Sequence, residues 1–450
     1  MSDAPRRRSF VVRRLILVWL RLSGSLWFLP IAIVIGVAAL AIALIAASDS
    51  FGQQVLARFP RLFGADADSS RSMLATIASS IITVEAVTFS ITVLAVTQAS
   101  MQYTPRILRN FLRDRTSQVT LGVLVGVFLY CLIVIRTIRT GGAAGRYVPS
   151  IAVLGAFVLA GIAIAALMYF IHHITSTLEA GSIIAQVSAE TVTAIRERFP
   201  ATYRAGSDAV PSAQAPQSAC TSTSWHPIPA QRSGYIQQVE QDDLFRLAVD
   251  RTRLIRMEVG VGDFVSQGAP LISTAGDAAD EGLAEQVQKL YTIRPYRTVH
   301  QDPAFGIRQM VDIAVKALSP GVNDTTTAIT CIDYLRPILI ELGVRCHPRA
   351  LRSHEGELRL IAKFRTFDEL LRATIDEIRL NAAGNPRVLG RLLLVLRESA
   401  DVAPGMPGRS DVILACAADV LRTARHSIAM ADRLALEEEY ALVERIARHA

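Results

Sequence analysis

One acidic side chain lies deep within an otherwise apolar stretch of the chain. Glu85 belongs to ITVEAVTFSITVLAVTQAS, residues 82–100. It is about eight residues from the outer end of this predicted span, roughly 12 Å at the helical rise. An ionisable group at that depth costs several kcal/mol unless water or a partner reaches it. Glu85 therefore predicts a functional site inside the membrane.

Two hydroxyl side chains share the predicted helical face of Glu85. Thr88 and Thr92 follow it at spacings of three and four residues, which puts all three on one side of a helix. Two interpretations remain open. This face lines a water-filled path on which Glu85 attracts cations or takes up a proton, or Glu85 is protonated and bonded to a neighbouring helix. Tyr130 in the third predicted span lies at similar depth and completes the candidate intramembrane polar face.

A second candidate site is the connection ALSPGVNDTTTA, residues 317–328. Its Ser-Pro-Gly ends one apolar helical run, and Asn323 or Asp324 caps the next. The Thr-rich first turn presents backbone N–H groups that suit an anion. Either Asp324 satisfies them and the segment is only a corner, or its oxygens hold a phosphate-bearing ligand or a cation; a negatively charged cap competes with an anion and favours the corner. The candidate residues are Lys316, Ser319, Gly321, Asn323, Asp324, Thr325 and Thr326.

The elements that position Glu85 are long apolar stretches. The chain has 450 residues, of which 51% are hydrophobic, too many for an average soluble protein. A helix needs about 20 apolar residues to cross a bilayer. Four stretches qualify, at about Leu26–Ala47, Ile77–Ala99, Val119–Ile138 and Ser150–Ile171.

Arginines at the ends of these stretches predict the topology. The net charge of +7 divides into +10 for residues 1–175 and −3 for the remainder, so the polar half lacks the basic surface of a nucleic-acid-binding protein. Ten arginines precede the first span or separate the second from the third, against six in the other two loops. The positive-inside rule then places both termini in the cytoplasm. Arg106, Arg109 and Arg113 lie on the polar face of an amphipathic segment expected to rest on anionic lipid.

Small residues recur at four-residue spacing within the spans. Gly122 and Gly126, and Ala152 and Ala156, are examples. Such spacing lets helices approach closely in a membrane. The packing is expected within one bundle, with packing between subunits as the alternative.

The remainder of the chain predicts a cytoplasmic α+β domain. In residues 234–276, β-rich runs surround the turn VGDFVSQGAPL, which resembles the barrel-sandwich modules of biotinyl and lipoyl domains and of efflux adaptors but offers no lysine for a carrier group. We expect a basic interfacial segment at 1–25, a four-helix transmembrane domain at 26–175, a cytoplasmic helix and flexible linker at 176–230, a small β module at 231–280 and a mainly helical domain with a hairpin at 281–450.

Two quoted stretches carry a more specific resemblance. FGIRQMVDIAVKALSPGVNDTTTAITCID and SITVLAVTQASMQYTPRILRNFLRDR resemble the bacterial membrane proteins grouped as domain of unknown function 2254. In that family the corner usually reads Asn-Asp-Pro-Thr-Thr-Ala, so Thr325 stands where proline is usual. The resemblance implies a bacterial inner-membrane location and no particular biochemical activity.

Catalytic and cofactor signatures are missing from the sequence. It contains no P-loop, GxGxxG, HExxH or Ser-His-Asp pattern, so we expect a non-enzymatic protein without cofactor or metal. Its five cysteines form no CxxC pair, as in reduced intracellular proteins. The first functional hypothesis is a gated, channel-like conduit for an ion or small solute, formed by a homo-oligomer. The second is a non-conducting sensor or scaffold that binds a ligand or protein partner.

Overall fold

The computed structural model describes eight stretches of the chain. They are residues 28–58, 66–102, 115–139, 147–177, 180–200, 224–276, 281–402 and 408–449. The chain divides into two compact units, residues 1–179 and 180–450.

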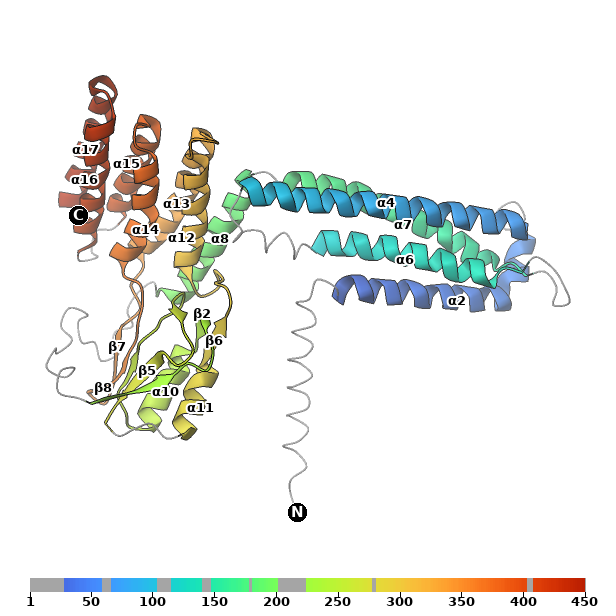
Figure 1. Ribbon diagram of the computed structural model, residues 1–450, viewed down its shortest axis with the longest axis horizontal. Coiled ribbons are helices and arrows are strands. Elements are labelled where there is room, and N and C mark those ends of the chain that lie inside the picture. Colours follow the sequence, from blue (N-terminus) through green and yellow to red (C-terminus); the bar gives the residue numbers. More distant parts are fainter. Residues whose placement is uncertain are drawn as a thin grey trace, which may run out of the picture. The chain divides into compact units, whose positions relative to one another are not determined.

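The first unit consists of long apolar helices that run alongside one another (Figure 1). In the described part of the chain, four helices are long and apolar enough to cross a membrane, which confirms the predicted spans. The second begins at Ala67 rather than near Ile77, because a more polar first part extends the same helix. The four are α2 (Phe28–Arg58), α4 (Ala67–Gln102), α6 (Arg115–Thr137) and α7 (Ser150–Thr177).

Helix α6 makes the most extensive contacts in this unit, with α2, α4 and α7. Two of its glycines allow the approach of α2. A Cβ atom on Gly122 would lie 2.9 Å from Cα of Pro30, and one on Gly126 would lie 3.1 Å from a methyl of Val37. The predicted small-residue packing therefore occurs within one bundle at these two positions.

The outer surface of the helices is strongly apolar. Ile35, Leu94 and Met168 are 64%, 60% and 68% exposed. A soluble protein rarely leaves so many large apolar side chains exposed side by side, whereas in a bilayer they contact lipid. Their exposure therefore agrees with the membrane assignment.

The second unit contains a helical part whose helix starts are capped by side chains. Asp302, Asp324, Thr366 and Asn385 each accept a hydrogen bond from a first-turn backbone N–H, which satisfies a donor that the helix itself leaves unpaired. The helices are α8 (Ala180–Arg198), α12 (Pro303–Ala317), α13 (Thr325–Val344), α14 (Phe367–Asn381), α15 (Pro386–Asp401), α16 (Arg409–Ser427) and α17 (Met430–His449).

The strands of the second unit form two sheets, with orders β1-β5-β3-β8-β7 and β4-β2-β6. The hairpin predicted around Glu355–Gly356 is present as β7 and β8. Two short helices, α10 (Gln241–Asp250) and α11 (Glu281–Leu290), complete this part. The strands are β1 (Trp225–Pro229), β2 (Gly234–Val239), β3 (Ile255–Met257), β4 (Phe264–Val265), β5 (Pro270–Ala275), β6 (Tyr291–Arg294), β7 (Leu351–His354) and β8 (Glu357–Ile361).

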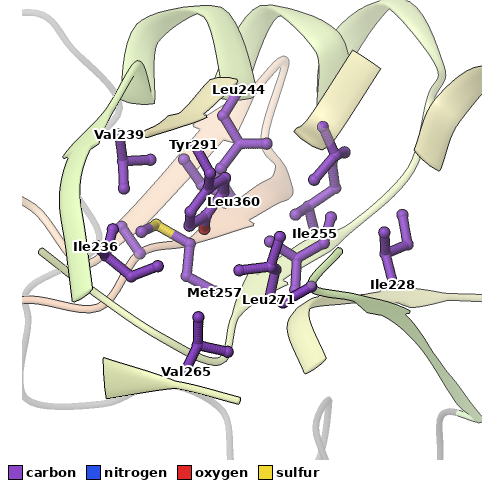
Figure 2. Close-up of a cluster of buried hydrophobic side chains, with 14 of the residues drawn as sticks. Ile228, Ile236, Val239, Leu244, Ile255, Met257, Val265, Leu271, Tyr291 and Leu360 are labelled. Atoms are coloured by element: carbon purple, nitrogen blue, oxygen red, sulfur yellow. The ribbon is translucent and has the colours of Figure 1, made fainter. Parts of the chain in front are cut away.

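The β part is larger than the module predicted at 231–280. Strand β3 pairs in parallel with β8 from the distant hairpin, and β6 pairs with β2. Figure 2 shows Leu360 of β8 among the buried side chains around Ile255 and Met257. The boundary predicted at residue 280 is too short. A strand edge can pair with a strand from any part of the chain, and a local turn pattern does not show which one.

The turn between β3 and β4 joins the two parts of the second unit. Gly262 has a φ of +89°, and a Cβ there would lie 2.6 Å from a carboxylate oxygen of Asp302, the cap of α12. Asp263 accepts a hydrogen bond from the amide of Gly260 at 3.0 Å and pairs with Lys363 at 3.0 Å. The glycine is required for both its backbone conformation and this close approach.

Candidate functional site

The predicted polar face lies on the packed side of helix α4. Ala67, Leu74, Ile81, Thr88 and Ala95 recur every seven residues and are all buried, as expected for a helix that packs along a left-handed seam. Thr88 is thus part of the seam, against which α6 packs.

Glu85 and Thr92 flank this seam and are half-buried. The nearby residues Val87, Phe89 and Val93 are 53%, 57% and 49% exposed. The shared face of Glu85, Thr88 and Thr92 therefore exists. Thr88 is buried in the seam, whereas Glu85 lies at the edge of the packed side, one helical turn from the exposed Phe89.

The two threonine hydroxyls on this face are satisfied within the helix. Thr88 Oγ1 donates to the carbonyl of Val84 at 2.8 Å, and Thr92 Oγ1 donates to the carbonyl of Thr88 at 2.8 Å. Glu85 differs, because no hydrogen bond or ion pair reaches its carboxyl group from the residues that the structure describes. The face thus contains one polar group with unused bonding capacity.

Tyr130 takes part in a hydrogen-bonded link between helices. It is fully buried in α6, and its hydroxyl donates to the carbonyl of Ala152 in α7 at 2.7 Å. The amide of Ala152 in turn donates to Ser48 Oγ of α2 at 3.3 Å. Since its single proton is used in this link, Tyr130 joins three helices and does not act as the hydrogen-bond donor for Glu85.

The chemistry open to this site is that of a lone carboxyl group. Ionised, Glu85 offers two oxygens that accept hydrogen bonds or bind a cation; protonated, it offers one donor. An ionisable side chain at the centre of a span normally faces a bundle interior or a water-filled cavity. Glu85 can therefore receive a proton or a cation that reaches this depth.

The corner between α12 and α13 is closed by its own side chains. Oδ1 of Asp324 accepts from the amide of Thr327 at 3.0 Å, and Oδ2 accepts from the hydroxyl of Thr327 at 2.6 Å. These two bonds, the hydroxyl bond first, lower the pKa of Asp324 below its ordinary value of 3.8. The carboxylate occupies the position that a bound anion would need.

The neighbouring residues complete the corner. Asn323 has a φ of +49°, a conformation that asparagine tolerates better than most residues. Ser319 Oγ donates to the carbonyl of Lys316 at 2.7 Å, and Asn385 Nδ2 donates to Thr325 Oγ1 at 2.9 Å. These contacts favour the corner over the ligand cradle, because the oxygens proposed to hold a ligand already hold the protein together.

The remaining predicted site falls where the structure gives no description. The loop with Arg106, Arg109 and Arg113 lies outside the described residues. Its contact with anionic lipid stays a prediction.

Comparison with other proteins identifies a matching family but no matching solved structure. The family described as "Predicted membrane protein", domain of unknown function 2254, matches residues 23–398. An uncharacterized protein of Mycobacterium bovis and another of Mycobacterium tuberculosis are each 30% identical to this chain over 417 residues, covering 91% of it and 78% of their own length. No solved structure matches. The sequence match and the four apolar helices together establish that this chain is a membrane protein of the domain of unknown function 2254 family.

Proposed function

We propose that this protein is a non-enzymatic conduit for protons or small cations in the bacterial inner membrane. The path follows the polar face of α4, both chain termini are cytoplasmic, and the second unit controls opening. One observation carries the proposal: Glu85 lies half-buried at the edge of the packed face of a helix long and apolar enough to span a membrane, with no partner for its carboxyl group among the described residues.

The physical argument concerns the free energy of that carboxyl group. Insertion measurements give about 2.5–3.5 kcal/mol for a charged residue at the centre of a membrane helix. A hydrogen bond to the bundle would reduce this cost, and the described part of the bundle provides none. Access of water or ions to Glu85 offsets part of this cost instead, which is the property of a conducting path.

A homo-oligomer is the arrangement that we expect to form the path. Within one chain α4 already packs on α6, and the side of the helix beyond Glu85 carries exposed apolar residues such as Val93 and Phe89. Association of several copies would surround Glu85 with protein while leaving lipid, including anionic lipid, at the periphery. We expect no nucleic-acid partner.

Flux through liposomes tests this function. Purified protein is reconstituted, and proton flux is followed with an entrapped pH-sensitive dye in parallel with potassium flux. Glu85→Gln keeps the side-chain shape and removes the charge, so flux is expected to fall by at least about tenfold, roughly 1.4 kcal/mol in the barrier. Ser90→Ala is the matched control, since Ser90 is exposed on the other side of α4 and, within the described residues, its hydroxyl bonds only to the carbonyl of Ala86.

The alternative is a non-conducting sensor or scaffold. It is favoured by the internal hydrogen bonds of Thr88 and Thr92, because hydroxyls that are satisfied by their own helix need no water. A monomer in detergent, with equal flux from wild type and Glu85→Gln, would support this alternative over the conduit.

A further inference from the structure

A cavity lies in the second unit where the helical part meets the β part. It encloses about 120 Å³, many times the ~10–15 Å³ that one water molecule needs. Its wall combines the end of α8, the start of α12, the start of α14 and the turn between β3 and β4. The cavity is therefore built from segments far apart in the sequence.

The acidic side chains in its wall are already engaged. Asp302 accepts two hydrogen bonds from Arg297, at 2.7 and 3.0 Å. Asp263 is paired with Lys363, and Glu369 accepts from the amide of Thr366 at 3.0 Å in a capping box. Arg297 and Lys363 thus neutralise Asp302 and Asp263, and the charge of Glu369 is stabilised by an amide hydrogen bond.

Arg198, the last residue of α8, differs from the other charged residues of the wall in its lack of a bonding partner within the described chain. In the described part of the chain its guanidinium makes no hydrogen bond or ion pair, although it is half-buried. Burial lowers the pKa of Arg198 below its ordinary value, and the negative charges of Glu240 and Asp242 oppose this shift only in part. By contrast Arg196, two residues earlier, is exposed and pairs with Glu341 at 3.1 Å.

The remaining wall suits the organic part of a ligand. Phe199, Val261 and Leu370 contribute apolar surface. Through Gln241, Pro348 and Phe364 the cavity shares its wall with a neighbouring hollow of about 370 Å³. An anionic group at Arg198 would thus leave room for an attached apolar or ring-bearing group.

We propose that this cavity binds a phosphate-bearing small molecule, with Arg198 as the principal contact to the phosphate. The planar guanidinium donates two parallel hydrogen bonds to such an oxyanion, and Lys363 and Arg365, which both pair with the single carboxylate of Asp263, leave one excess positive charge in the wall. This site does not depend on the proposed conduit function. In a conduit the bound ligand would regulate opening, and in a sensor it would be the signal that is detected.

Binding of phenyl phosphate to the full chain in detergent micelles tests the site. Wild type is expected to bind it by calorimetry, and Arg198→Gln to weaken binding by at least about tenfold, the loss of one charge-assisted pair. Arg196→Gln is the control on the same helix and should bind like wild type. Lys363→Gln, at a half-exposed position, provides a second reading if Arg198→Gln does not fold, with an expected loss of about threefold.

Two sources of phosphate are separated by repeating the titration with a short-chain phosphatidic acid in the same micelles. Binding of phenyl phosphate identifies a soluble ligand, and binding of the phosphatidic acid alone identifies a lipid headgroup. Either result supports the site if Arg198→Gln weakens binding or, where that variant does not fold, if Lys363→Gln does. No binding of either compound, wild-type affinity in a folded Arg198→Gln, or wild-type affinity in Lys363→Gln where Arg198→Gln does not fold, would overturn the proposal. Neither result depends on flux, so the proposed function can fail separately.

Discussion

The polar face of α4 and the corner between α12 and α13 both present a carboxylate near threonines at helical spacing, yet they differ in what those groups bond to. At the corner, both oxygens of Asp324 accept hydrogen bonds from Thr327. On α4, the threonines bond to their own helix, and Glu85 has no bond within the described chain. The first carboxylate stabilises the fold and the second remains available.

This difference has a simple cause. A cap joins residues three apart at a helix start, where unpaired N–H groups are always present. In mid-helix those donors are already bonded, so a carboxylate must find its partner on another element or in water. Similar residue types therefore indicate a corner in one place and a candidate site in the other.

The largest effect should come from replacing Glu85 with leucine. Because Glu85 has no bonding partner to lose among the described residues, the variant should gain roughly 1–3 kcal/mol of bundle stability, the part of the cost of this polar group that water does not offset. Unfolding in mixed micelles with increasing dodecyl sulfate measures the change. Ser90→Leu is the control for added apolar surface on the exposed side of α4. A loss of stability in Glu85→Leu would show that Glu85 has a bonding partner and would remove the contrast with Asp324.

At the corner between α12 and α13, removing the carboxylate is expected to lower the stability instead of raising it. Asp324→Ala removes both hydrogen bonds to Thr327, and loss of such a cap costs about 1–2 kcal/mol. Thermal unfolding of the second unit measures it. Thr326→Ala, an exposed position in the same turn, should change stability by less than about 0.5 kcal/mol. Equal effects of the two substitutions would mean that the cap contributes nothing particular.

Local patterns explain how much of this fold the sequence predicts. The four spans, the cap at Asp324 and the hairpin at Glu355–Gly356 each depend on residues within one continuous stretch of sequence. The pairing of β3 with β8 joins residues about a hundred positions apart, and the strand pattern alone does not specify that partner.

The candidate sites likewise contain features that local sequence predicts and features that depend on residues far apart in the chain. The common face of Glu85, Thr88 and Thr92 follows from helical periodicity, whereas the role of Tyr130 depends on which carbonyl of α7 lies opposite its hydroxyl. Arg198 carries no signal in the sequence, because it differs from Arg196 only in which elements surround it. The unused bonding capacity of a side chain is a property of the assembled fold.

The smallest effect expected is the pH dependence of the corner. The pKa of Asp324 is lower in the folded protein than its ordinary 3.8, so the charge on Asp324 stabilises the fold above about pH 4 and this contribution is lost as the pH falls through the folded pKa. Asparagine caps a helix without charge, so wild type should exceed Asp324→Asn by a few tenths of a kcal/mol at pH 7. Their thermal unfolding temperatures should then converge below about pH 4. A difference in unfolding temperature that persists or widens in acid would show that it comes from the geometry of the cap and not from its charge. Asp324 and Glu85 would then differ only in their hydrogen bonds.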